Sequence, residues 1–210
     1  MPKITSVEAQ KRNKDRVNVY VDDQFLVGVS AYAVAKHKLQ VDQEVDPAKL
    51  ESVLFEDELE KAKGYITSYL MNKTQHILIE KLTKKGYEEG VVQKALEWAR
   101  HYKFVDDEDY ARKFAKDGSN LKKNGKRMIA QKLKQKGVEQ TSIDMALSAI
   151  SESDELESAA KALKSKIETY KRKTKSEREW KQKCIQFLMG RGYGFDIAKK
   201  TMEMTAYEEE

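Results

Sequence analysis

The chain has 210 residues, 36% of them charged and 40% hydrophobic, with a formal net charge of +5. Abundant Lys and Glu with only two prolines and ten glycines favour a mainly helical fold with several small cores. The single cysteine excludes an intramolecular disulfide, and no apolar run approaches the roughly 18 residues that cross a bilayer. We therefore expect a cytoplasmic protein that does not contact a membrane.

Residues 1–46 differ from the rest and predict a small β-rich extension. Alternating β-branched and aromatic residues predict a β-hairpin or three-stranded sheet with strands at 4–9, 17–21 and 25–29. Residues 22–24 form a tight turn, and Ser30 is a suitable N-cap for a short helix over residues 31–38. We expect this helix to cover one sheet face with Tyr32, Val34, Ala35 and Leu39.

Residues 47–104 predict the first of three helical repeats. Its helices are expected at 47–70, as one helix or two joined near 55–58, at 75–85 and at 88–102. Asp46 caps the first helix, which Pro47 opens. Thr74 caps the second, and Gly86 ends it in a left-handed conformation.

Residues 105–150 predict the second repeat on the same plan. Asp106 or Asp107 caps its first helix, which residues 117–120 weaken, and Asn124-Gly125 is a turn dipeptide. The apolar stripe of the second helix leads to Gly137, and the third helix covers 141–150.

Residues 151–210 predict the third repeat. A cap at 151–154 precedes a first helix that reaches Tyr170, and residues 171–175 form a charged loop. A capping box, Ser176-x-x-Glu179, opens the second helix.

The second helix of each repeat ends in the same pattern, a leucine four residues before a glycine. The pairs are Leu82 and Gly86, Leu133 and Gly137, and Leu188 and Gly192. The glycines are 51 and 55 residues apart, a spacing typical of a repeated supersecondary unit. We interpret each pair as a structural corner, and expect three-helix units in tandem to form an elongated, curved array.

The basic residues are concentrated in the second repeat. Residues 112–136 contain ten lysines or arginines and one acidic residue, Asp117. The ten are Arg112, Lys113, Lys116, Lys122, Lys123, Lys126, Arg127, Lys132, Lys134 and Lys136. Charges of one sign over this length favour contact with a polyanion or an acidic protein surface, with a solvated face as the alternative.

We find no pattern that indicates catalysis, and we expect no enzymatic activity, metal or cofactor. The three histidines are scattered, Cys184 lies on an apolar stripe, and the carboxylates at 106–109 suit capping better than metal binding. Residues 190–194 lack the Lys-Ser/Thr of a phosphate loop and indicate a third corner with extra flexibility. Six aromatic residues fall mainly on apolar stripes, which favours core packing: Tyr65, Tyr69, Tyr87, Tyr110, Phe114 and Tyr193.

Four segments together resemble one known family. They are Leu82-x-x-x-Gly86-Tyr87, Phe104-Val105-Asp106-Asp107-Glu108-x-Tyr110-Ala111-Arg112, Lys123-x-Gly125-Lys126-Arg127-x-Ile129-x-x-Lys132-Leu133-x-x-Lys136-Gly137 and Phe187-Leu188-x-x-Arg191-Gly192-Tyr193. In this combination, residues 60–205 resemble the RecX family of recombination regulators, and residues 1–46 look like the extension of its longer members. The family often has arginine where this chain has Lys84, Lys85 and Lys126, and lysine does not offer the same bidentate contacts.

The resemblance implies a non-enzymatic, monomeric modulator of RecA that lies in the groove of the RecA–single-stranded DNA filament. It would inhibit ATP hydrolysis and strand exchange and so affect DNA repair and the SOS response, with DNA contacts that are weak or depend on the filament. The ten basic residues are the candidate contact set. Reversing Lys122, Lys123, Lys126 and Arg127 to Glu is expected to abolish inhibition without unfolding. The alternative is a helical-repeat protein that binds nucleic acid independently of RecA.

Overall fold

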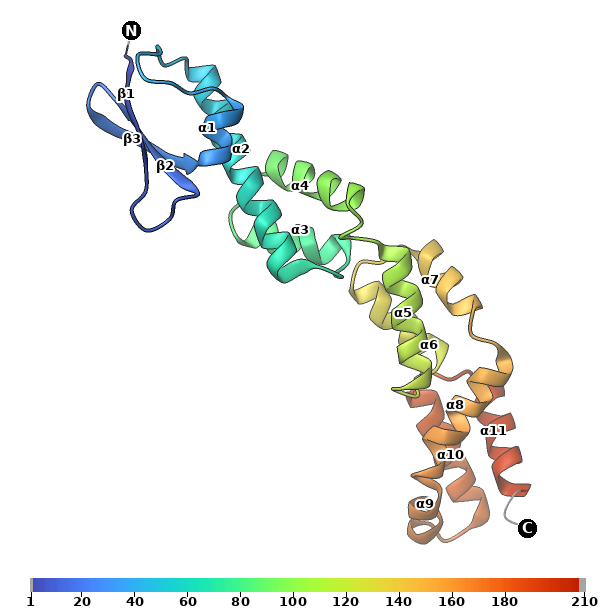
Figure 1. The fold of residues 1–210 in the computed structure, drawn as a ribbon. Helices are drawn as coiled ribbons and strands as arrows, with labels where there is room; N and C mark the ends of the chain where they lie inside the picture. Colours follow the sequence, from blue (N-terminus) through green and yellow to red (C-terminus); the bar gives the residue numbers. More distant parts are fainter. Residues whose placement is uncertain (1, 208–210) are drawn as a thin grey trace. The chain divides into compact units, whose positions relative to one another are not determined.

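The structure is a computed structural model that describes residues 2–207. These residues form two compact units, whose elements are labelled in Figure 1. The first unit holds the described residues up to Met71 together with Leu78–Phe104, and the second holds Asn72–Ile77 and the described residues from Val105 onward.

The fold is mainly helical with a small N-terminal sheet, as predicted. The first part of the chain forms β1 (Ile4–Ala9), β2 (Arg16–Val21), β3 (Gln24–Ser30), α1 (Ala31–Lys36), α2 (Pro47–Tyr65), the π-helical turn η1 (Ile66–Leu70), α3 (Gln75–Lys84) and α4 (Glu89–His101). The rest forms α5 (Asp107–Asn120), α6 (Lys126–Gln135), α7 (Gln140–Ser148), α8 (Glu152–Lys164), α9 (Ile167–Lys173), α10 (Glu177–Gly190) and α11 (Phe195–Tyr207). None of the helices within residues 2–207 is both long and apolar enough to cross a membrane.

The three strands form an antiparallel sheet in the order β1-β2-β3. Val19 in the central strand pairs with Val7 on one side and Val27 on the other. Asp22 and Asp23, with φ of 48° and 62°, make the predicted tight turn between β2 and β3. This left-handed pair suits the right-handed twist of a hairpin.

Helix α1 packs against the sheet through only part of the predicted face. Ser30 is its N-cap and accepts a hydrogen bond from the backbone N–H of Ala33. Ala33 is fully buried, with Val34 and Leu39 against the same core, whereas Tyr32 is 54% exposed and Ala35 is also exposed. The expectation for Tyr32 and Ala35 is therefore wrong, because a small residue lets this short helix approach the sheet closely.

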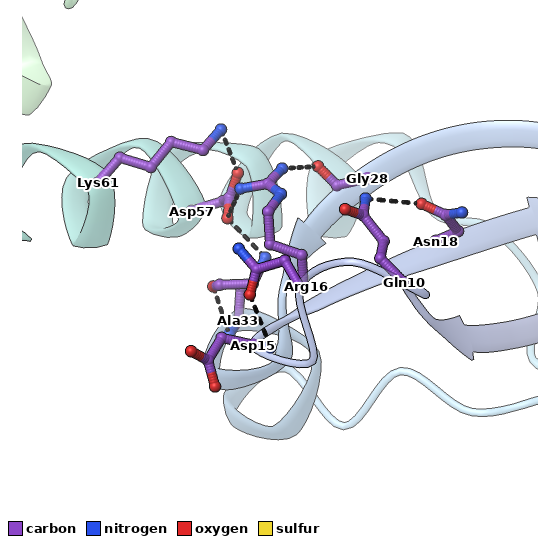
Figure 2. Close-up of polar contacts among 10 residues, drawn as sticks. Gln10, Asp15, Arg16, Asn18, Gly28, Ala33, Asp57 and Lys61 are labelled. Carbon is purple, nitrogen blue, oxygen red and sulfur yellow. Dashed lines mark hydrogen bonds and ion pairs between the residues drawn. The ribbon is translucent and has the colours of Figure 1, made fainter.

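A buried polar junction joins the sheet to α2. Asp57 is 2% exposed, and its Oδ1 accepts the backbone N–H of Ser30 at 2.6 Å. Its carboxylate also pairs with Lys61 at 2.7 Å and Arg16 at 3.6 Å, and Arg16 donates in turn to the carbonyl of Gly28 (Figure 2). Sheet, α1 and α2 are thus tied by charge-assisted hydrogen bonds in addition to the apolar contact at Val53.

Helix α2 is continuous. Asp46 caps it and Pro47 opens it as predicted, and there is no break near residues 55–58. Its last turn passes into η1, where Tyr69 is 71% exposed and stacks obliquely on Tyr65. The expectation that Tyr69 packs in the core is therefore wrong.

The second unit contains two three-helix sets with separate cores. Helices α5, α6 and α7 enclose Ile129, Leu133 and Ile143, and helices α8, α10 and α11 enclose Leu163, Cys184 and Leu188. These are the second and third repeats of the sequence pattern.

Four local predictions for this unit fail. Residues 117–120 do not interrupt α5, which continues to Asn120. Gly118 lets α6 approach, because a Cβ at this position would lie 2.9 Å from Ile129 Cγ1. The first helix of the third repeat breaks between α8 and α9, and the expected charged loop is helical as far as Lys173. Ser176 caps α10 through the N–H of Glu179, but the Glu179 carboxylate accepts from Lys175 instead of completing the capping box.

Candidate partner-binding surface

The three corners have the predicted local structure. Leu82, Leu133 and Leu188 are fully buried, and the glycines four residues later have φ of 88°, 74° and 90°. A left-handed residue at this point ends an α-helix and is strained for any residue with a Cβ.

The corner at Gly137 is covered by the start of α3. Thr74 Oγ1 donates to the carbonyl of Lys136 at 2.6 Å, and the N–H of Gln75 donates to Asp107 Oδ1 at 2.9 Å. The His76 side chain lies where a Cβ on Gly137 would be. The corner is therefore a packing site within the second unit as well as a helix end.

The corner at Gly192 is covered by the start of α6 in the same way. The N–H of Gly125 donates to the carbonyl of Arg191 at 3.0 Å, and the N–H of Lys126 is 3.4 Å from Glu155 Oε1. A Cβ on Gly125 would overlap the backbone at Gly192, and a Cβ on Gly192 would overlap Met128. Gly125 is thus a close-packing residue, which the turn interpretation of Asn124-Gly125 missed.

Arg191 binds the loop between α5 and α6, which carries Lys122 and Lys123. Its guanidinium donates to the carbonyl of Lys123 at 2.8 Å, to the carbonyl of Lys122 and to Asn124 Oδ1 at 3.3 Å. These contacts tie the loop between α5 and α6, in which Lys123 has a φ of 51°, to the Gly192 corner.

The ten candidate basic residues lie on α5, on α6 and in the segments next to α6. Arg112 and Lys116 are i, i+4 neighbours on one side of α5, and the i, i+4 pair Tyr110 and Phe114 lies on another. On α6, exposed Arg127 and Lys134 and half-buried Lys132 flank the buried stripe.

Three of the ten have acidic partners. Arg112 and Lys113 both pair with Asp109, and these cations lower the pKa of its carboxyl, chiefly through the hydrogen bond from Lys113. Lys126 Nζ is 3.6 Å from Glu155, which is only 7% exposed. Within residues 2–207 the other seven have no acidic partner: Lys116, Lys122, Lys123, Arg127, Lys132, Lys134 and Lys136.

Two of these free cations gather over a pair of aromatic rings. Tyr110 and Phe114 are stacked, with their centroids 5.9 Å apart. Lys136 Nζ lies 6.0 Å from the Tyr110 centroid and 5.9 Å from that of Phe114, and Lys122 Nζ lies 5.5 Å from Phe114. We call these four residues the aromatic–lysine cluster. Both rings are half-buried and pack against the core that α5, α6 and α7 enclose, as the sequence predicts. The i, i+4 aromatic pair next to the basic stretch was the signal for the cluster.

The residues that sequence analysis set aside have structural roles. Burial raises the pKa of the Cys184 thiol to about 11, which makes it unreactive near neutral pH. Asp106 caps α5 through the N–H of Asp109. Tyr193 is buried and shares a hydrogen bond with Ser158 at 2.9 Å. No group of three or more His, Cys, Asp or Glu side chains within residues 2–207 is placed to hold a metal ion.

Comparison with known families matches three segments of the chain. Residues 2–46 match the regulatory protein RecX N-terminal domain, residues 106–147 the second three-helix domain of RecX, and residues 152–202 the third.

Curated relatives match over nearly the whole chain. A regulatory protein RecX of Clostridium botulinum (strain Alaska E43 / Type E3) is 37% identical over 205 residues, which cover 97% of this chain and 96% of the relative. That of Clostridium perfringens (strain SM101 / Type A) is 36% identical over 198 residues, which cover 93% and 92%.

Solved structures agree. A crystal structure of regulatory protein RecX has a TM-score of 0.79 at 26% identity, covering 97% of this chain and 100% of that one. RecX from Lactobacillus salivarius shares the fold, with a TM-score of 0.64 at 19% identity over 71% of this chain and 95% of that one. With these matches in sequence and in fold, the chain belongs to the RecX family of regulatory proteins.

Proposed function

We propose that this chain is a cytoplasmic, non-enzymatic regulator that binds the RecA–single-stranded DNA filament and slows its ATP hydrolysis and strand exchange. The observation that carries the proposal is the aromatic–lysine cluster within a basic stretch. Lys122 and Lys136 have no acidic partner within residues 2–207, so their charge is available to an acidic protein surface or to phosphates.

The aromatic rings also favour a second candidate, a nucleic-acid-binding protein that acts without RecA. Rings flanked by cations are typical of proteins that bind single strands, because bases stack on the rings and lysines follow the backbone. The two functions differ in whether the filament is needed for binding.

The structure changes which charge reversal is informative. Lys126 is paired with the buried Glu155, so a glutamate at position 126 would place two carboxylates together and destabilise the fold. Lys123 itself has a left-handed backbone conformation in the loop between α5 and α6, so a substitution there also affects the backbone. The side chains of Lys122 and Lys136 contact the rest of the chain mainly through cation–π interactions, which are worth about 0.5–1 kcal/mol each at such sites.

We expect the double variant Lys122→Glu, Lys136→Glu to stay folded and to need about tenfold or more protein for half-inhibition of RecA ATP hydrolysis. The assay is single-stranded-DNA-dependent ATP hydrolysis by RecA across a titration of this chain. The control is Lys173→Glu, Lys175→Glu, which makes the same charge change at exposed residues near the end of α9. Equal inhibition by both variants and the unchanged chain would remove the cluster from the mechanism.

A further inference from the structure

The corners at Gly137 and Gly192 each receive the start of a helix through the same three groups. One is the carbonyl of the residue before the glycine, which accepts from the N-cap residue, Thr74 or Gly125. The second is the bare glycine surface, which the first turn of the helix covers, through the His76 side chain at Gly137 and chiefly through the Met128 backbone at Gly192. The third is an acidic residue from the first helix of the repeat, Asp107 or Glu155, which accepts the next backbone N–H.

The corner at Gly86 presents the same three groups without an occupant. Within residues 2–207 the carbonyl of Lys85 accepts no hydrogen bond, and a Cβ built on Gly86 would have no atom within 4 Å. The residues after the other two glycines, Val138 and Tyr193, are buried, whereas Tyr87 is only half-buried.

Glu58 is the acidic group of this corner. It is half-buried on α2, and it has no hydrogen-bond or ion-pair partner in the described part of the chain. Burial, and then the charge of Glu58, raise the pKa of Tyr87, as burial and the charge of Glu155 raise that of Tyr193. The charge of each carboxylate thus acts on the tyrosine that follows its corner.

We propose that the Gly86 corner is a docking site for the N-terminus of an α-helix of the partner protein, one that begins with a Ser, Thr or Gly N-cap. The N-cap donates to the Lys85 carbonyl, the first turn lies on Gly86, and a free backbone N–H of that turn donates to Glu58. A carboxylate is the natural acceptor there, because the first N–H groups of a helix are unpaired and carry a partial positive charge.

The chain's own helices do not supply this occupant. The starts of α3 and α6 already cover corners, and each begins 11 residues before its glycine, at Gln75 and Lys126. Helix α10 begins at Glu177, 15 residues before Gly192, so its start lies about one turn further from its own corner than the starts of α3 and α6 do from theirs.

The proposal rests on the proposed function, in which the partner is the RecA filament protein.

The test uses the full chain with Gly86→Asn. Asparagine tolerates the left-handed conformation better than other residues with a Cβ, and its side chain enters open space, so the fold is kept and the docking surface is blocked. Gly64→Asn is the matched control, because Gly64 is exposed on α2 in the same unit and also has no atom within 4 Å of an added Cβ. Glu58→Gln removes the charge of the acceptor and keeps its shape.

We expect Gly86→Asn to raise the concentration for half-inhibition of RecA ATP hydrolysis about tenfold, Glu58→Gln to raise it several-fold, and Gly64→Asn to leave it unchanged. Circular dichroism checks that all three are folded. Inhibition by Gly86→Asn equal to that of the unchanged chain overturns the docking site and leaves the proposed function standing. If the unchanged chain does not inhibit, the proposed function fails and the docking site falls with it. Self-association in sedimentation that Gly86→Asn abolishes would make a second copy the occupant, and would overturn the assignment to the partner.

Discussion

Gly192→Ala is expected to lower the free energy of unfolding by about 3–5 kcal/mol. A Cβ in the left-handed conformation costs about 1–2 kcal/mol, and this one would also overlap the backbone of Met128, which no rotamer change relieves. The shift needed to remove the overlap would weaken the hydrogen bond from the N–H of Gly125 to the carbonyl of Arg191. Urea unfolding followed by circular dichroism measures the loss.

The other corners supply the comparison. Gly86→Ala has the same backbone strain but open space around the Cβ, so we expect a loss of only about 1–2 kcal/mol. Gly190→Ala, at the last residue of α10 and also in open space, is expected to be neutral or slightly stabilising. Equal losses for Gly192→Ala and Gly86→Ala would show that close packing at the Gly192 corner contributes nothing to stability.

Asp57→Ala is expected to cost about 1–3 kcal/mol, because it leaves the backbone N–H of Ser30 without its acceptor and removes the partner of two partly exposed cations. Asp57 pairs with Arg16 and Lys61, as Figure 2 shows, and it also accepts the N–H of Ser30. Thermal or urea unfolding of the full chain measures the change.

Two further variants separate charge from hydrogen bonding at the junction. Asp57→Asn keeps an oxygen for the N–H of Ser30 but loses the charge, so its cost should lie between zero and that of Asp57→Ala. Glu51→Ala, at an exposed position of the same helix, should change stability by no more than about 0.5 kcal/mol. A loss from Asp57→Ala no larger than that from Glu51→Ala would contradict the role given to the junction.

Local signals predicted most of the secondary structure. The strands, the caps at Ser30, Asp46 and Asp106 and the three left-handed glycines were all visible, because each depends on a few neighbouring residues. The close-packing role of Gly125 was not visible, since it depends on a contact with a residue 67 positions later, Gly192. A turn dipeptide and a close-packing glycine look the same in one sequence.

The candidate surface was predicted less completely than the fold. The basic stretch was evident from charge alone. Charge does not show, however, that Lys126 forms an ion pair with Glu155 or that Arg112 and Lys113 both pair with Asp109. Those pairings depend on helix faces and on contacts between repeats. The same reason hid the unoccupied corner at Gly86, which becomes evident only beside the two occupied ones.

Co-sedimentation with RecA filaments tests the central claim most directly. The unchanged chain is mixed at near-physiological salt with single-stranded DNA alone, and with the same DNA coated by RecA and a slowly hydrolysed ATP analogue. We predict that the chain pellets with the coated DNA at concentrations at which it stays in the supernatant with DNA alone. Equal pelleting with both would support a nucleic-acid-binding protein that acts without RecA, and absence from the filament pellet would contradict the account.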